Sequence, residues 1–140
     1  MQDGRVGQRN ERIIRTLDSR IQTKVRTALS LAGAAGHTLV VYQGRRTYHE
    51  QDSFYAIGRG SGDTRRVVTH GSGGQSPHNY GLAVDAALAP LEGRAIDWHG
   101  DFTLVHDAGV AAGLESGADW PQPKTDLPHL QMPGWRTLIP

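Results

Sequence analysis

One ten-residue stretch of the 140-residue chain carries the side chains best suited to chemistry, the segment SPHNYGLAVD at 76–85. It places His78 and Asp85 seven positions apart, with Gly81 between them. His and Asp are both good zinc ligands. A loop that turns at Gly81 into a strand would let the two side chains converge on one point. Two ligands do not make a stable site, and the best candidate for a third is His129.

An open zinc site is the chemistry that these residues could support. Such a site has three protein ligands and a free position for water, whose pKa the metal lowers from about 15.7 to about 7. His78, Asp85 and His129 meet this requirement. Asp126 lies three residues before His129 and is the candidate general base, which would move the proton from water to the leaving amine. Arg46 is the candidate cation for the oxyanion or for a substrate carboxylate, because its planar fork suits carboxylates.

Each of these residues also has a purely structural interpretation. His78 or Asp85 alone could be a loop residue that bonds to backbone, Asp126 a turn carboxylate before a proline, and Arg46 a surface ion-pair residue. The remaining histidines are interpreted as surface or capping residues, and Trp98 and Trp120, by residue type, as core residues. The histidines interpreted as surface or capping residues are His37, His49, His70, His99 and His106.

The first third of the chain predicts a helix and a strand that support the site. Residues 1–9 are expected to be frayed. Apolar residues at spacings of three and four predict an amphipathic helix over about 10–31, with Asn10 as its N-cap. Residues 37–43 are rich in β-branched side chains and predict a strand. These elements should pack together, helix on sheet.

The turn that carries Arg46 should connect this strand to a second helix. Thr47 followed by Glu50 is a capping box, which predicts a helix that ends near Ile57. The glycine-rich segment 58–75 predicts a long loop, with Val67–Thr69 as a candidate short strand. Loops of this length are unusual unless they are functional.

The second half predicts three further elements. A strand over 82–88 carries Asp85. A helix from about Trp98 or Asp101 to Ala112 should stop at Gly113. A short strand over 128–132 carries His129. The chain has neither an internal repeat nor a linker, and its length fits a single domain, 1–140.

Charge, cysteine content and the lengths of apolar segments exclude several classes of function. The net charge of +1 gives no reason to expect that the chain binds nucleic acid. Residues 1–30 are nevertheless basic, with seven Arg or Lys and three Asp or Glu. A basic helix face can contact an anionic polymer or lipid surface. The alternative is a solvated helix face. The absence of cysteine excludes disulfides and thiolate ligands, so any metal must be held by His, Asp or Glu. No segment has the apolar length of a signal peptide or a membrane span.

The motifs together resemble the zinc D-Ala-D-Ala carboxypeptidase and L-alanyl-D-glutamate endopeptidase family, peptidase family M15, and within it the branch that includes phage endolysins. The resemblance covers roughly residues 37–132. It is carried by the pattern SxHxxGxAxD at 76–85, DxxH at 126–129, GxRT at 44–47, GADW at 117–120 and PHLQ at 128–131. Some family members have Glu at the position of Asp126, and an aromatic residue is common at that of Leu130.

The resemblance implies a zinc ion held by His78, Asp85 and His129, with Asp126 as the catalytic base. It also implies Arg46 near the substrate and Trp120 lining the cleft, and Ser76 is interpreted as a residue that shapes the approach to the metal and contacts substrate. The implied fold is of α+β class, a small antiparallel sheet flanked by helices, as in Hedgehog and D,D-peptidase domains. This agrees with the order of elements expected from the residues.

The leading functional hypothesis is a monomeric zinc hydrolase that cuts peptidoglycan stem peptides between L-Ala and D-Glu. As a phage endolysin it would stay in the host cytoplasm, without a signal peptide, until a pore releases it across the inner membrane to degrade the cell wall and lyse the host. The alternatives are a D-Ala-D-Ala carboxypeptidase or dipeptidase and a non-catalytic, zinc-stabilised module that binds the cell wall. A domain without metal is a third alternative.

Overall fold

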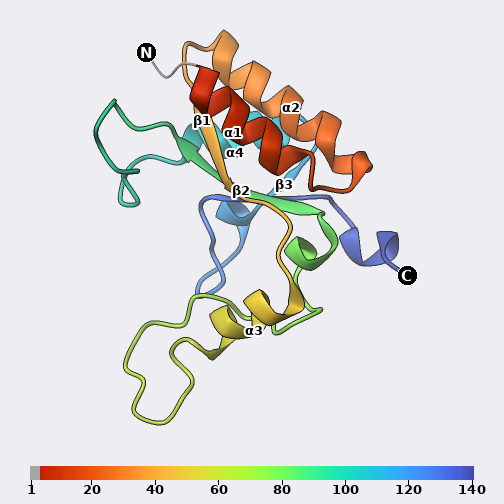
Figure 1. Ribbon diagram of the computed structural model, residues 1–140, viewed down its shortest axis with the longest axis vertical. Helices are drawn as coiled ribbons and strands as arrows, with labels where there is room; N and C mark the ends of the chain where they lie inside the picture. Colours follow the sequence, from red (N-terminus) through yellow and green to blue (C-terminus); the bar gives the residue numbers. More distant parts are fainter. Residues whose placement is uncertain (1–3) are drawn as a thin grey trace.

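The computed structural model describes residues 4–140, which form one antiparallel sheet with helices packed against it (Figure 1). The strands lie in the order β1 (Leu39–Gln43), β2 (Ala83–Leu88), β4 (His129–Gln131) and β3 (Glu115–Ser116). The two central strands of this sheet, β2 and β4, are the ones that carry Asp85 and His129. The predicted α+β class, with a small antiparallel sheet flanked by helices, is confirmed.

Three helices supply the apolar core that supports the sheet. They are α1 (Gly4–Ile14), α2 (Ser19–Ala34) and α4 (Thr103–Ala111), which pack together near β1 and β2 (Figure 1). Their buried side chains form one cluster with Val84 and Ala86 of β2. Since side chains alternate along a strand, Asp85 points away from this cluster. The opposite face of the sheet is therefore the one that carries polar chemistry.

The other helical segments lie in the connections between strands and after the last strand. They are α3 (Tyr48–Ala56) and three short 3-10 turns, η1 (Pro77–Tyr80), η2 (Gly117–Asp119) and η3 (Trp135–Leu138). Within residues 4–140 no helix has the length and apolar character needed to cross a membrane.

The N-terminal prediction of one helix after a frayed end is wrong in two respects. Residues 4–9 are helical, while residues 1–3 lie outside the described part of the chain. The predicted helix over 10–31 is broken after Ile14, and α2 starts anew with Asp18 as its cap, whose carboxylate accepts from the backbone N–H of Arg20 at 2.9 Å. The backbone N–H of Asp18 also donates to Gly81 O at 3.0 Å, so the break between the helices touches the turn before β2.

Asn10 is not an N-cap, because it lies inside α1 with 6% of its surface exposed. Its amide donates to Leu39 O at 2.9 Å and accepts from the N–H of Val41 at 2.8 Å. These bonds satisfy backbone groups on β1, the edge strand of the sheet, which would otherwise be open to pairing with another chain. A polar residue on an otherwise apolar helical stripe was the signal for this contact.

Most of the remaining elements match their predictions. The capping box of Thr47 and Glu50 is present at the start of α3. The helix α4 ends before Gly113, whose φ of +91° favours glycine. Two expectations are wrong: Val67–Thr69 forms no strand, and Trp98 is half exposed rather than part of the core.

Candidate metal centre

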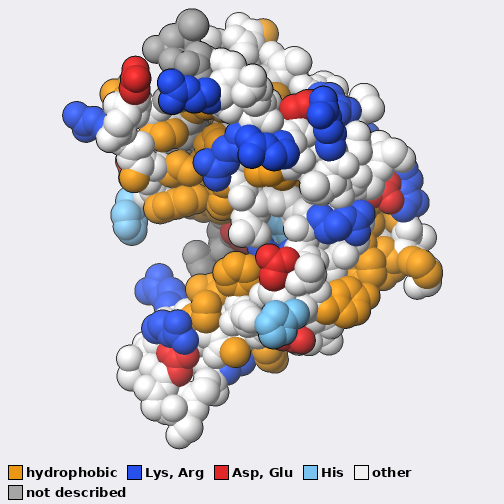
Figure 2. Space-filling view, in the orientation of Figure 1, with side chains coloured by type: hydrophobic (Ala, Val, Ile, Leu, Met, Phe, Trp, Pro, Cys, Tyr) orange, Lys and Arg blue, Asp and Glu red, His pale blue; other side chains and the backbone are white. Residues whose placement is uncertain are grey.

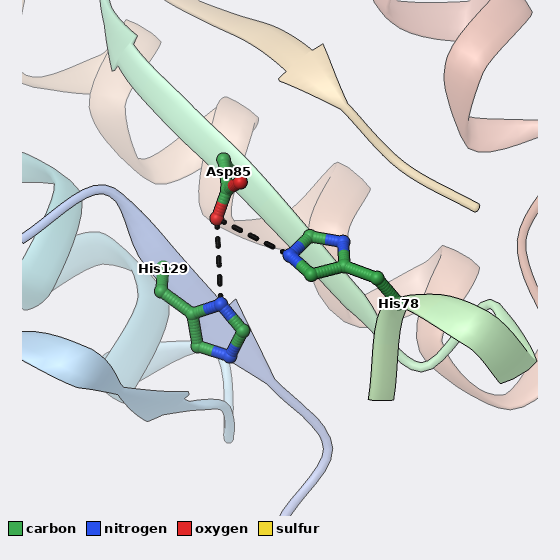
Figure 3. Close-up of side chains that lie close together, drawn as sticks. All are labelled: His78, Asp85 and His129. Carbon is green, nitrogen blue, oxygen red and sulfur yellow. Dashed lines mark ion pairs between the residues drawn. The ribbon is translucent and has the colours of Figure 1, made fainter. Parts of the chain in front are cut away.

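Three side chains from different elements converge on the polar face of the sheet (Figure 3). The ligand atoms of His78, Asp85 and His129 all lie within 4.8 Å of one another. Asp85 Oδ1 is 3.4 Å from His78 Nε2 and 3.4 Å from His129 Nδ1. Both imidazoles are buried, and the Asp85 side chain is 13% exposed. The structure thus brings together the three residues that the sequence predicted as metal ligands.

Strand pairing and one tight turn create this convergence. Asp85 and His129 are direct partners in the antiparallel pairing of β2 with β4, so their side chains share one face. His78 comes from η1, and the chain turns from η1 into β2 at Gly81, which has a φ of +68°. A side chain at Gly81 would be strained in this conformation and would also clash with Arg45. This glycine is therefore part of what aims His78 at the site.

In each histidine, the ring nitrogen that does not face Asp85 makes a hydrogen bond that holds the ring in place. His78 Nδ1 donates to Gly44 O at 2.8 Å, and His129 Nε2 donates to the Gln131 side-chain oxygen at 2.8 Å. These bonds fix the tautomers and leave the lone pairs of His78 Nε2 and His129 Nδ1 directed at Asp85. Metal-binding histidines are oriented in this way by partners behind them.

The residues present fit a divalent metal ion. Asp85 Oδ1 is a buried oxygen without a hydrogen-bond partner, an uncommon state for a buried polar atom. Two imidazole nitrogens and one carboxylate oxygen are a donor set that zinc accepts. Burial opposes ionisation of Asp85, whereas positive charge on His78 and His129, when these rings are protonated, holds the pKa of its carboxyl well below the ordinary value. The carboxylate is therefore ready to bind a cation.

Asp126 lies at the edge of this cluster. Its Oδ2 is 3.9 Å from His129 Nδ1, and 46% of its side chain is exposed. Partial burial of the carboxyl, together with the charge of Asp85, raises the pKa of Asp126. Gly117 allows the approach of this segment, since a Cβ there would lie 2.4 Å from Asp126 O. A water-accessible carboxylate with a raised pKa beside the ligands has the properties of a general base.

Arg46 lies on the other side of Asp85. Its Nη2 is 3.7 Å from Asp85 Oδ2, and its guanidinium stacks on Phe54 with 4.6 Å to the ring centre. Three of its N–H groups donate to glutamine oxygens, one to Gln51 at 2.7 Å and two to Gln43 at 2.8 and 3.1 Å. Burial lowers the pKa of Arg46 from its ordinary value, although Asp85 opposes the shift. Arg46 thereby joins β1, α3 and the metal centre.

The two residues predicted to contact substrate take different places. Trp120 is half buried, with its ring centre 5.0 Å from that of His129, and its indole N–H donates to Glu115 at 3.0 Å. Ser76 is 8% exposed, and its hydroxyl accepts from the backbone N–H of His78 at 3.2 Å. This bond caps η1, so Ser76 helps to position His78. A direct contact of either residue with substrate stays a prediction.

Sequence reasoning missed the residues behind this site. Gln131 could have been found, because it lies two positions after His129 on a strand and therefore shares its face. Gln51 had no such signal: it is fully buried and ties Arg46 to the loop after α3, donating to Gly71 O at 2.6 Å. Gln43 also had none, because it lies beyond an irregularity in β1.

Comparison with known proteins identifies the family. The chain is 38% identical over 117 residues to the peptidoglycan L-alanyl-D-glutamate endopeptidase CwlK of Bacillus subtilis (strain 168), an alignment that covers 75% of this chain and 67% of that protein. A family model for peptidase family M15, described as D-alanyl-D-alanine carboxypeptidase, matches residues 69–132. The chain belongs to peptidase family M15. The predicted family is confirmed.

Solved structures share the fold of this M15 chain. The Serratia marcescens L-Ala D-Glu endopeptidase ChiX is 22% identical, with a TM-score of 0.62 over 93% of this chain and 90% of that one. The D,D-pentapeptidase VanY from a VanB-type vancomycin resistance cassette, solved with Zn(II), is 20% identical with a TM-score of 0.62, covering 86% and 74%. The same sheet and helices thus serve more than one peptidase.

Proposed function

We propose that this M15 chain is a zinc-dependent peptidase that cleaves peptidoglycan stem peptides between L-Ala and D-Glu. The observation that carries the proposal is the convergence of two tethered imidazoles on a buried carboxylate oxygen that has no hydrogen-bond partner. The relative CwlK, named for the L-alanyl-D-glutamate bond, supports the choice of bond.

In this proposal His78, Asp85 and His129 hold the metal. A zinc ion there would supply Lewis acidity, which polarises a carbonyl and lowers the pKa of water. Gly44 O and Gln131 keep both imidazoles in the tautomer that presents a lone pair. Asp85 contributes the negative charge that a divalent cation requires.

Asp126 and Arg46 have separate roles in the proposed reaction. Asp126 accepts a proton from the attacking water and returns it to the amine of D-Glu as the peptide bond breaks. Arg46 steadies the Asp85 carboxylate and presents its positive charge to the developing oxyanion or to a carboxylate of the substrate. Trp120 forms a wall beside His129.

The products of digestion test the proposal. Purified peptidoglycan is incubated with the protein, and the fragments are identified by mass spectrometry. New N-terminal D-Glu supports the endopeptidase. Release of D-Ala alone would instead establish the second candidate, a D,D-carboxypeptidase, which the description of the matching family model favours. Wall binding without any cleavage would leave a non-catalytic zinc module.

The site of action also follows as a proposal. The motifs resemble those of phage endolysins, so we place the protein, as a monomer, in the host cytoplasm until a pore releases it to the wall. Expression in a bacterial host should then cause lysis only when a pore-forming protein is expressed with it. Lysis at the same rate without the pore would contradict this placement.

The basic N-terminal helices supply a further contact in this proposal. Arg9 and Arg12 of α1 are exposed, and Figure 2 shows Lys and Arg side chains gathered over the upper part of the molecule, where α1 and α2 lie. Such a surface would attract an anionic wall polymer or membrane by charge. The double variant Arg9→Glu, Arg12→Glu should reduce sedimentation with cell walls at low salt. Equal sedimentation of both proteins would refute the contact.

A further inference from the structure

The loop between β2 and α4 carries an aromatic residue that no part of the proposed reaction uses. Trp98 is 50% exposed and packs edge-on against Tyr42, with ring centres 4.8 Å apart and an angle of 77° between the rings. The contact with Tyr42 fixes one side of the indole and leaves the rest of it to solvent. A tryptophan held in this way offers a rigid apolar surface together with a polar N–H group.

An irregularity in β1 places Tyr42 opposite Asp85. Val41 pairs with Ala86 and Gln43 pairs with Asp85, so Tyr42 is an extra residue on its strand. A bulge of this kind places two residues opposite one and re-aims a side chain. Tyr42 and Gln43 are accordingly both opposite Asp85. Burial of the Tyr42 hydroxyl, with the nearby charges of Asp85 and Asp126, raises its pKa, which agrees with this placement.

The order of the strands then gives the site an aromatic ring on each side. The ligands Asp85 and His129 lie on the central strands β2 and β4. Trp120 lies at the β3 side of the sheet against His129, while Tyr42 and Trp98 lie at the β1 side. Figure 2 shows the surface hollowed between the part that holds the loop after β2 and the part that holds α3, with apolar side chains on both rims. An extended substrate lying across the strands would meet both aromatic groups.

The proposed substrate has a sugar at the distance that this arrangement requires. In peptidoglycan the amino group of L-Ala is bound to the lactyl group of N-acetylmuramic acid. One residue and one lactyl group separate the scissile carbonyl from the sugar ring, a span of roughly 7 Å. The neighbouring strand lies about 4.8 Å from the one that carries Asp85. A pyranose ring has an apolar C–H face that can stack on an indole.

We infer that Trp98, supported by Tyr42, forms a subsite for the muramyl sugar of the stem peptide. This inference rests on the proposed function, since it concerns the sugar next to the cleaved bond. Asp97 and His99 flank Trp98 and are exposed, so polar groups are available at the edge of the ring for the sugar hydroxyls. The subsite would make the enzyme favour stem peptides that are still attached to glycan.

Two substrates that differ only in the sugar test the inference. One is a stem tripeptide capped with a D-lactyl group, and the other is the same tripeptide capped with N-acetylmuramic acid. The ratio of their kcat/KM values is measured for the wild type, Trp98→Ala, Trp98→Phe and Leu91→Ala. Leu91 is the matched control, because it is 75% exposed on the same loop and has no part in the subsite.

The wild type should favour the muramyl peptide by about tenfold, which corresponds to about 1.4 kcal/mol. Trp98→Ala should bring the ratio close to one, Trp98→Phe should retain most of the preference, and Leu91→Ala should keep the wild-type ratio. An unchanged ratio in Trp98→Ala, or a wild type without preference, would overturn the inference.

A binding measurement separates this inference from the proposed function. Calorimetry compares the affinity of Asp126→Ala for the muramyl peptide with that of the double variant Asp126→Ala, Trp98→Ala. A loss of about tenfold in the double variant supports the subsite, and equal affinities refute it. If the wild type hydrolyses neither substrate, the proposed function has failed, while the calorimetry still decides the subsite.

Discussion

Within residues 4–140, one group of histidine and carboxylate side chains lies on the polar face of the sheet and another surrounds His106 of α4, and they differ in what their polar atoms contact. In the first, His78 and His129 direct free lone pairs at an Asp85 oxygen that has no hydrogen bond. In the second, His106 Nδ1 contacts Asp107 at 2.7 Å, and its Nε2 contacts Asp119 at 2.9 Å. Both nitrogens of His106 thus have carboxylate partners, whereas the three facing atoms of the first group are all acceptors and suit a bound cation.

Burial and tethering account for the difference. The imidazoles of the first group are almost fully buried and held from behind by Gly44 O and Gln131. The carboxylates of Asp107 and Asp119 are 65% and 60% exposed, so water and salt screen their attraction to the imidazole. Residue type alone therefore does not identify a metal centre, since both groups contain the same two kinds of side chain.

The largest effect should come from removing the carboxylate at the centre of the first group. Asp85→Ala should abolish zinc binding and hydrolysis, because it removes the ligand that both imidazoles face. Asp119→Ala is the matched control and should keep both. Zinc content by elemental analysis and peptidoglycan digestion measure the outcome. Equal zinc loss in the two variants would mean that the two groups do not differ in metal binding.

The next effect separates binding of metal from catalysis. Asp126→Ala should keep zinc but lower kcat by about 10²–10⁴-fold, the range expected for a general acid–base residue. Asp126→Glu retains a carboxylate and should recover part of the activity. Steady-state hydrolysis of a defined muropeptide, with zinc content determined on the same samples, provides the measurement. Zinc loss in Asp126→Ala would place this residue among the ligands instead.

A smaller effect is expected from the residue behind His129. Gln131→Leu removes the acceptor for His129 Nε2 and should weaken zinc binding by roughly 10–100-fold. Gln131→Glu keeps an acceptor and should bind zinc more tightly than Gln131→Leu. Competition with a chromogenic chelator gives the affinities. Wild-type affinity in Gln131→Leu would mean that the tether does not orient the ring.

The smallest effect should come from the second group. Hydrogen bonding to Asp107 raises the pKa of His106 although burial opposes it, and Asp119 adds to the rise. A raised folded-state pKa stabilises the fold below the unfolded value of about 6.5, and this stabilisation is lost as pH rises through the folded-state pKa.

His106→Ala should therefore destabilise the protein more at pH 5 than at pH 8.5, by at most about 1 kcal/mol because the ion pairs are exposed. Urea unfolding at the two pH values measures it, with Val110→Ala, an exposed residue of the same helix, as the control. A larger loss at pH 8.5 would contradict the sign of this linkage.

The sequence predicted the convergence of His78 and Asp85 because their spacing implies their geometry. His78, Gly81 and Asp85 lie close together in the chain, so a turn followed by a strand brings the two ligands near each other. His129 required a strand pairing across more than forty residues, which no local pattern encodes, and the resemblance to the M15 family strengthened that choice. The tether of His78 escaped prediction because it is a backbone carbonyl, whereas that of His129 could have been found from the two-residue spacing of Gln131 on its strand.

Predictions of the fold failed where tertiary contacts outweigh local pattern. The apolar spacing around Leu17 continues through the break between α1 and α2, so periodicity alone suggested one helix. Capping by Asp18 and its bond to Gly81 O stop the helix. Asn10 was interpreted as a cap because asparagine favours that position. In the structure its amide instead forms hydrogen bonds with backbone groups on the exposed edge of β1.

Anomalous diffraction at the zinc absorption edge, from crystals of the protein purified with zinc, tests the central claim most directly. The account predicts one strong peak between His78 Nε2, His129 Nδ1 and Asp85 Oδ1, at about 2.0–2.2 Å from each atom. The absence of a peak there, or a peak at His106 and Asp119 instead, would contradict the assignment of the metal centre.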